Sequence, residues 1–252
     1  MTIVTLAIFV IGIWSLAFYS SRKLHNDLRR LLSDQQFSVV TLVAEEVNQE
    51  LSDRLVVLER VAKRVSPALL GDAVALQAFL EERLILQGPF NSEVVVYRHD
   101  GTAVGRVPRS KGLVNFRPAD GDPVAAALTA GKTTVGRPVV DTALRAGVFG
   151  MAVPIRDPQG VVIGALVGVT NLAQSNFLDR ITGHRYGKTG HYFIVAPRER
   201  LLVMSSNRSR IMEKLPGPGV IAWLDRAFEG YEGSAVYQNQ FGEEMLASDK
   251  RV

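Results

Sequence analysis

The pattern of hydrophobic and polar positions divides the chain into a long N-terminal helix and a following region of short strands and helices. Residues 2–19 carry no charged side chain, and residues 13–66 contain neither glycine nor proline. At about 1.5 Å per residue, the uncharged segment rises roughly 27 Å, close to the ~30 Å hydrocarbon core of a membrane. We therefore predict a transmembrane anchor over residues 1–20 that continues as one helix over residues 21–66.

The helix beyond the anchor carries apolar residues at helical spacing from Val40 to Val65. Two interpretations are open for this stripe: the helix packs on its own domain, or it pairs with a second copy. Nearer the anchor, leucines recur at positions 24, 28, 31 and 32, which favours a homodimer through this helix. Pro67 ends the helix, since proline disfavours helical geometry in the residue before it.

After Pro67 the spacing of apolar residues changes from helical to strand-like. We expect helices over residues 72–86 and 122–130, and strands over residues 93–97, 103–107, 133–140, 148–155 and 161–169. Residues 161–169 are apolar throughout, which is typical of a central strand covered on both faces. Residues 67–172 therefore form a first module.

Residues 173–252 repeat the order of elements of the first module. A linking helix over residues 171–181 precedes a hairpin (191–196 and 201–205), a helix (220–228) and a second hairpin (234–240 and 244–248). This second module has no counterpart to the strand at 161–169, so we expect it to be incomplete. The predicted fold class is α+β, with two tandem antiparallel modules carried on the long helix.

Composition adds limits on function. The chain has 252 residues, of which 47% are hydrophobic and 21% charged, with a formal net charge of +4 and no cysteine. This is ordinary globular composition with one apolar segment added, and it excludes disulfides and thiolate metal sites. No basic stripe with interleaved aromatics is present, so we expect no nucleic-acid partner.

The sequence contains no recognisable catalytic constellation. Its four histidines lack metal-ligand spacing, and there is no G-x-S-x-G elbow. The run at residues 183–189 (GHRYGKT) has three residues between its glycines, where a phosphate-binding loop needs four, and it leads into a strand. We therefore expect no catalytic residue, no cofactor and no metal, and this fragment is predicted not to be an enzyme.

Two motifs resemble double Cache (PAS-like) sensor domains: residues 187–195 (GKTGHYFIV) and the hairpin from Val153 to Gly164. The resemblance implies a bacterial inner-membrane receptor whose sensor region is periplasmic. Residues 67–172 would be the membrane-distal, ligand-binding module and residues 173–252 the membrane-proximal one. The resemblance points to a missing cytoplasmic diguanylate cyclase or phosphodiesterase of cyclic di-GMP signalling. The alternatives are a histidine kinase, a chemoreceptor, or a tethered binding protein without enzymatic output.

The amino-acid-sensing branch of that family carries R-x-W-Y, then Y-x-D, then an aspartate on the last strand. Here Arg117 lacks the W-Y, Asp141 keeps the second aspartate, and Thr170 replaces the third. Arginine forks match carboxylates, so we expect a small organic carboxylate as ligand. The candidate ligand-binding residues are Tyr97, Arg117, Arg137, Asp141, Arg145, Phe149 and Thr170.

Overall fold

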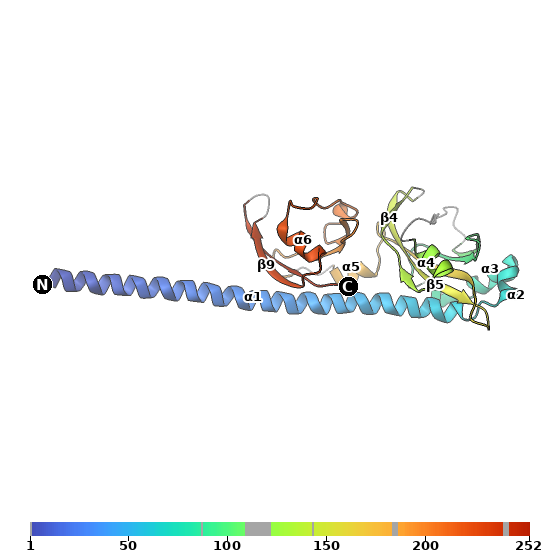
Figure 1. Ribbon diagram of the computed structural model, residues 1–252, viewed down its shortest axis with the longest axis horizontal. Helices are drawn as coiled ribbons and strands as arrows, with labels where there is room; N and C mark the ends of the chain where they lie inside the picture. The colour runs from blue at the N-terminus through green and yellow to red at the C-terminus, as the bar shows by residue number, and fades with distance from the viewer. Residues whose placement is uncertain (1, 87, 109–121, 143, 183–185, 239–241) are drawn as a thin grey trace. The chain divides into compact units, whose positions relative to one another are not determined.

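The computed structural model describes the chain except residues 1, 87, 109–121, 143, 183–185 and 239–241, and the side chains of residues 2–8, 84 and 182. The described residues form two compact units. One contains residues 46–220, and the other contains residues 1–45 together with residues 221–252. Figure 1 shows the elements of both units along the chain.

Helix α1 runs from Thr2 to Ala62, which confirms the long helix predicted from the absence of glycine and proline. It ends before Ser66 because that residue caps the next helix. The Ser66 hydroxyl accepts a hydrogen bond from the Leu69 N–H at 3.2 Å, and Pro67 occupies the first turn of α2 (Pro67–Gly71).

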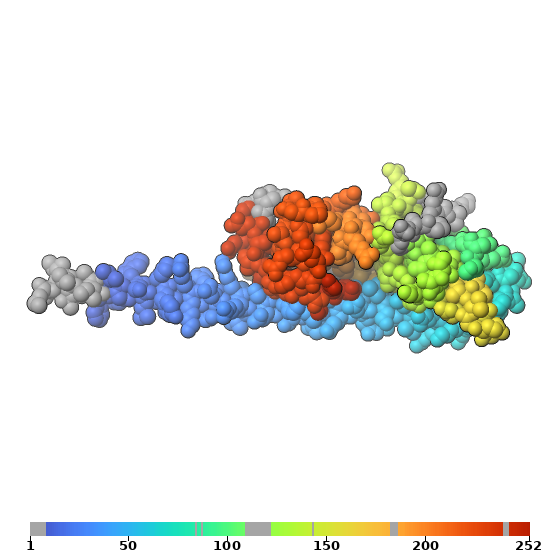
Figure 2. Space-filling view, in the orientation of Figure 1, coloured from blue at the N-terminus to red at the C-terminus, as the bar shows by residue number. Residues whose placement is uncertain are grey.

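Residues 9–19 of α1 are uncharged, and the large side chains among them are exposed. Phe9 is 71% exposed and Trp14 is 75% exposed, and on the face drawn in Figure 2 the helix surface after the grey residues is visible. Over the described residues, however, no helix meets the length and hydropathy that a membrane crossing needs. The anchor predicted over residues 1–20 is therefore not shown, and the side chains of residues 1–8 lie outside the described residues.

Helix α3 (Ala73–Glu81) is shorter than the predicted helix over residues 72–86. The Asp72 carboxylate caps its start by accepting from the N–H groups of Val74 and Ala75, each at 3.0 Å. After α3 the chain tightens into a 3-10 turn, η1 (Leu84–Leu86), which buries Leu86.

The first module is built on a six-stranded antiparallel sheet. Strands β1 (Val94–Arg98) and β2 (Ala103–Val107) form a hairpin, and β6 (Val162–Asn171) lies between β1 and β5 (Ala146–Arg156). The central position predicted for residues 161–169 is thus confirmed. The single strand predicted over residues 133–140 is two strands, β3 (Thr134–Val135) and β4 (Val139–Asp141), which both pair with β5. The interruption contains Pro138, which has no N–H to donate to the ladder.

The two faces of this sheet are covered by different elements. Helix α4 (Pro123–Thr129) packs on β5 and β6, over a core of alternate strand residues. The opposite face receives α3, since a Cβ on Gly105 would meet Leu80 at 3.0 Å and Leu76 at 3.2 Å. It also receives Phe90, whose ring occupies the space that a side chain at Gly168 would need.

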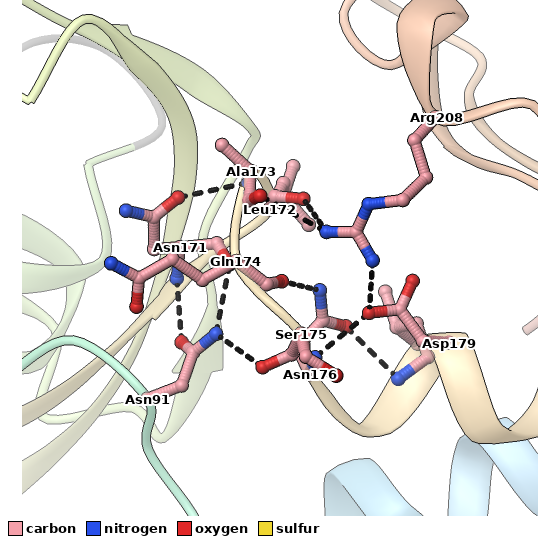
Figure 3. Close-up of polar contacts among 10 residues, drawn as sticks. Asn91, Asn171, Leu172, Ala173, Gln174, Ser175, Asn176, Asp179 and Arg208 are labelled. Atoms are coloured by element: carbon pink, nitrogen blue, oxygen red, sulfur yellow. Dashed lines mark hydrogen bonds and ion pairs between the residues drawn. The ribbon is translucent and has the colours of Figure 1, made fainter.

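The chain leaves β6 through a closely hydrogen-bonded junction, drawn in Figure 3. The Asn91 side chain donates to the carbonyls of Asn171 (2.9 Å) and Ser175 (3.0 Å) and accepts from the Asn171 N–H (2.8 Å). From the other side, Arg208 donates to the Ala173 carbonyl at 3.0 Å and pairs with Asp179 at 2.7 Å. This network joins β6 to the segment that follows it.

Helix α5 (Phe177–Thr182) starts later than the linking helix predicted at residue 171, because β6 continues to Asn171. Its start is a reciprocal cap: the Asn176 amide oxygen accepts from the Leu178 N–H (3.0 Å), and Asp179 accepts from the Asn176 N–H (2.9 Å). A two-stranded sheet follows, made of β7 (Phe193–Ala196) and β8 (Leu201–Ser205), and then a short 3-10 turn, η2 (Arg208–Arg210).

In the second unit, helix α6 (Ala222–Phe228) precedes a hairpin of β9 (Gly233–Gln238) and β10 (Glu244–Asp249). Residues of α1 contact this hairpin: Arg29 pairs with Glu244 at 2.7 Å, and the Ser234 hydroxyl donates to the Ser33 carbonyl at 3.0 Å. Among the described residues, β7–β8 and β9–β10 are separate two-stranded sheets. The α+β class and the long helix are confirmed, whereas a clear tandem of two PAS-like sheets is not shown.

Candidate functional site

Helix α4 closes one face of the six-stranded sheet, and its first residues are positioned by a capping aspartate. The Asp122 Oδ1 atom accepts a hydrogen bond from the Val124 N–H at 2.8 Å, and Pro123 fills the first turn. The apolar residues beneath the helix share one face of the sheet: Val95, Tyr97, Val148, Ala152, Ala165, Val167 and Val169. Polar side chains lie at the edge of this apolar core.

Four ionisable side chains meet at that edge, and we call them the α4 cluster: Glu93, Tyr97, Arg106 and Asp122. Glu93 is 2% exposed and lies 3.9 Å from the Arg106 guanidinium. Asp122 is 7% exposed, and its Oδ2 atom has no hydrogen-bond partner among the described residues. A buried carboxylate oxygen is costly without a donor, so Oδ2 is an acceptor of the cluster that the described residues leave open.

The electrostatics of the α4 cluster are dominated by its carboxylates. Burial, followed by the charges of Glu93 and Asp122, raises the pKa of Tyr97 to about 12, while Arg106 opposes the shift. Burial also raises the pKa of Asp122, against the stabilising N–H groups of Val124 and Ala125. The Tyr97 phenol thus lies in a field set by two carboxylates and one guanidinium, and the buried Asp122 Oδ2 atom offers an acceptor to a ligand donor.

Two of the residues predicted from the sequence lie on the α4 side of the sheet. Tyr97 belongs to the α4 cluster itself. Asp141 ends β4, is 8% exposed, and its Oδ1 atom accepts from the Leu144 N–H at 2.6 Å. Asp141 lies opposite Ala146 in the strand pairing of β4 with β5. Ala146 and Val148 point to the same face, and Val148 belongs to the core beneath α4, so Asp141 also lies on that face.

Phe149 and Thr170 lie on the opposite face from Tyr97. The two residues lie opposite each other on β5 and β6. Each is the direct neighbour of a residue that packs under α4, Val148 and Val169 respectively. Because successive strand residues point to opposite faces, Phe149 and Thr170 point away from α4. The Phe149 ring packs edge-on against Phe177, with centroids 6.4 Å apart. The structure therefore does not bring these two residues together with Tyr97.

The predicted arginines are scattered. Arg137 pairs with Glu199 at 3.1 Å. Arg145 is exposed, holds the left-handed backbone conformation at φ 50°, and lines a different cavity, of about 310 Å³, beside Met212 and Arg208. Arg117 lies outside the described residues. The two predicted arginines that the structure describes, Arg137 and Arg145, thus have different surroundings.

Sequence reasoning missed Glu93, Arg106 and Asp122 as site residues. Asp122 was visible as a helix start before Pro123, and Glu93 as the first residue of the strand predicted over residues 93–97. Neither signal reveals that both acids face the same phenol, because that proximity depends on how α4 docks on the sheet. Within the described part of the chain, no group of three potential ligands could hold a metal ion.

The described fold thus combines a long N-terminal helix with an antiparallel sheet that α4 covers on one face. No family model matches the chain. Among curated proteins, the methyl-accepting chemotaxis protein PctB of Pseudomonas aeruginosa is 29% identical over 218 residues. That alignment covers 83% of this chain and 32% of PctB, so the chain spans about a third of that relative's length.

Solved chemoreceptor domains share the fold. The ligand-binding domain of P. aeruginosa PctC in complex with GABA matches with a TM-score of 0.65 at 18% identity, covering 86% of this chain and 91% of that one. The ligand-binding domain of Pseudomonas fluorescens CtaA in complex with L-serine matches with a TM-score of 0.61 at 18% identity, covering 88% and 89%.

These likenesses confirm the predicted double Cache sensor resemblance at the level of the fold. They also support the prediction that this chain is a sensor and not itself an enzyme, since the similar proteins are a chemoreceptor and chemoreceptor ligand-binding domains. Of the outputs left open by the sequence, the comparisons favour the chemoreceptor over the diguanylate cyclase or phosphodiesterase that was our main prediction.

Proposed function

We propose that the chain is the periplasmic ligand-sensing region of a bacterial membrane chemoreceptor. The shared fold and the similarity to PctB support this proposal. The signalling part would lie in the remainder of a longer protein, because the chain corresponds to about a third of that relative. The ligand would bind in the first module, residues 67–172, and the second module would connect it to the membrane.

The membrane anchor and the dimer remain part of this proposal. The uncharged run of residues 2–19 is followed by Arg22 and Lys23, as expected of an anchor that meets the lipid headgroups. Leu24, Leu28 and Leu31 of α1 are 61%, 47% and 65% exposed, and they follow one another at helical spacing. A second copy of α1 is the partner that we propose for them.

For the ligand we propose a small molecule that carries a protonated amine, with amino acids as the first candidates. The observation that carries this choice is the buried Asp122 Oδ2 atom without a partner among the described residues. An ammonium group would supply the missing donor and offset the carboxylate charge. Arg106, beside Glu93, offers a guanidinium to a ligand carboxylate.

This proposal departs from the organic carboxylate expected from the sequence. That expectation depended on Arg117, Arg137 and Arg145 sharing one site, whereas Arg137 is ion-paired with Glu199 and Arg145 lines a cavity distinct from the α4 cluster. The complexes of CtaA with L-serine and of PctC with GABA, both ligands with an amine, lend support to the new choice. A simple organic acid would meet two carboxylates in the α4 cluster and be repelled by them.

A thermal-shift panel of amino acids, simple amines and organic acids on the 252-residue chain tests the ligand class. We expect at least one amine-bearing compound to raise the melting temperature, and Asp122→Asn to abolish the rise because the neutral amide loses the charge pairing. Asp72→Asn is the matched control, since Asp72 caps α3 as Asp122 caps α4 but is exposed. Stabilisation by organic acids alone would overturn the amine proposal.

A further inference from the structure

The unit made of residues 1–45 and 221–252 contains a cavity of about 240 Å³ between α6 and one face of the β9–β10 hairpin. Its floor is made of small residues: Ala235 lies opposite Ala247, and Gly233 lies opposite Asp249. Because these residues share one sheet face, the floor leaves space below the helix. We call this cavity the hairpin pocket.

Aromatic rings form the walls of the hairpin pocket. Trp223 of α6 and Tyr237 of β9 pack edge to face, with centroids 5.7 Å apart, and Tyr231 stands at the rim. The Trp223 Nε1–H is buried and has no acceptor among the described residues. The pocket therefore combines ring faces that attract cations with one unused hydrogen-bond donor.

Asp249 gives the hairpin pocket its charge. The carboxylate is half-buried and makes no hydrogen bond or salt bridge within the described part of the chain. Its neighbour Glu232 is engaged by Lys250. Burial, and then the charge of Glu232, raises the pKa of Asp249, and these effects outweigh the opposing charge of Arg251. The field at this carboxylate thus favours an added cation.

The remaining cation of the lining does not occupy the space between the walls. Arg226 is exposed, and its guanidinium lies 4.4 Å from the centre of the Tyr231 ring, at the rim. A ligand ammonium placed between Trp223 and Asp249 would therefore meet one indole face and one carboxylate.

We propose that the hairpin pocket is a second ligand site that binds a small organic cation bearing an oxygen acceptor, such as an amino alcohol or a quaternary ammonium alcohol. The ammonium would contact Trp223, Tyr237 and Asp249, and the oxygen would accept from the Trp223 indole N–H. The site is built only from residues 222–249 and is independent of the α4 cluster, which belongs to the other unit.

Titration calorimetry of choline and ethanolamine against the 252-residue chain tests this site. We expect choline to bind, and its uncharged carbon isostere 3,3-dimethylbutan-1-ol to bind at least about ten-fold more weakly, because the isostere lacks the charge. Asp249→Asn should weaken choline binding by about ten-fold or more. Glu229→Gln, an exposed acid beyond the same helix, is the control and should leave binding unchanged.

Trp223→Phe provides a second variant that keeps an aromatic ring but removes the indole donor. We expect it to weaken choline binding without altering the melting temperature of the free chain by more than a few degrees. Asp122→Asn should leave choline binding unchanged, so a failure of the hairpin pocket and a failure of the proposed amine site are distinguishable. Equal binding of choline and its neutral isostere, or no binding of either cation at about 10 mM, overturns the inference.

Discussion

Asp122 serves two roles through its two carboxylate oxygens. Oδ1 caps α4, whereas Oδ2 is buried without a partner among the described residues. The first role stabilises the fold and the second costs stability, since a buried charge lacks a compensating donor. Sites that bind charged ligands commonly retain such a cost, because the ligand supplies the missing interaction.

The cost at Asp122 predicts a pH-dependent effect of Asp122→Asn. Burial raises the pKa of Asp122 in the folded state above its ordinary value of 3.8. The folded state therefore holds this proton more tightly than the unfolded state, which stabilises the fold at pH values below 3.8. This stabilisation is lost as the pH rises through the raised pKa. Asparagine also caps helices well. We therefore expect the variant to match the wild type at low pH and to melt about 2–4 °C higher at neutral pH.

Thermal melts of both proteins across that pH range provide the measurement, and the quantity of interest is their difference at each pH. Other carboxylates titrate equally in both proteins and cancel. Asp72→Asn should show no such pH-dependent gain, since Asp72 is exposed. A variant that is less stable than the wild type at neutral pH would contradict our description of Asp122.

At the scale of elements, the buried side chain of Arg54 connects α1 to α5. Arg54 is 8% exposed, donates to the Pro89 carbonyl at 3.0 Å, pairs with Glu50, and lies 3.7 Å from the centre of the Phe177 ring. Glu50 also pairs with Arg180 of α5 at 2.7 Å. Phe177 in turn packs against Phe149 of the central sheet, so these contacts connect the sheet to the long helix.

Arg54→Ala should destabilise the chain by about 1–3 kcal/mol, because it leaves the Pro89 carbonyl without its donor, removes one of the two cationic partners of Glu50, and removes the guanidinium packed on Phe177. Arg60→Ala on the same helix should change stability by less than about 0.5 kcal/mol, since Arg60 is exposed. Urea denaturation of both variants measures the difference. If Arg54→Ala unfolded at the same urea concentration as Arg60→Ala, the proposed role of Arg54 in connecting α1 to α5 would be wrong.

The sequence predicted most elements of the fold but not how they end. The long helix, the β1–β2 hairpin and the central position of β6 follow from local patterns of apolar residues. The ends depend on side chains that find backbone partners only in the folded chain, as Ser66 does for α2 and Asn176 for α5. Such caps shift an element by several residues without any change in its apolar pattern.

The candidate site was less predictable than the fold. Tyr97 and Asp141 lie on the α4 side of the sheet as required, but Phe149 and Thr170 fall on the other side because strand residues alternate. Placing them from sequence needs the register of β5 against β6 to within one residue. Glu93, Arg106 and Asp122 meet only through the docking of α4, which no local pattern encodes.

At the scale of the whole molecule, the two units carry different candidate sites. The α4 cluster in residues 46–220 presents buried carboxylates beside one arginine, and the hairpin pocket in the other unit presents aromatic rings beside one carboxylate. In a receptor with two such sites, the size of the response to a ligand depends on how much more tightly that ligand binds one conformational state than the other. Whether ligand binding at one site changes the affinity of the other site can be measured directly.

The central claim is that Asp122 binds the amine of a small ligand beneath α4. Titration calorimetry with the most stabilising amine-bearing compound, on the wild type, Asp122→Asn and Asp249→Asn, tests it most directly. We predict a binding event that Asp122→Asn weakens by about ten-fold or more and that Asp249→Asn leaves unchanged. Undiminished binding to Asp122→Asn would contradict the account.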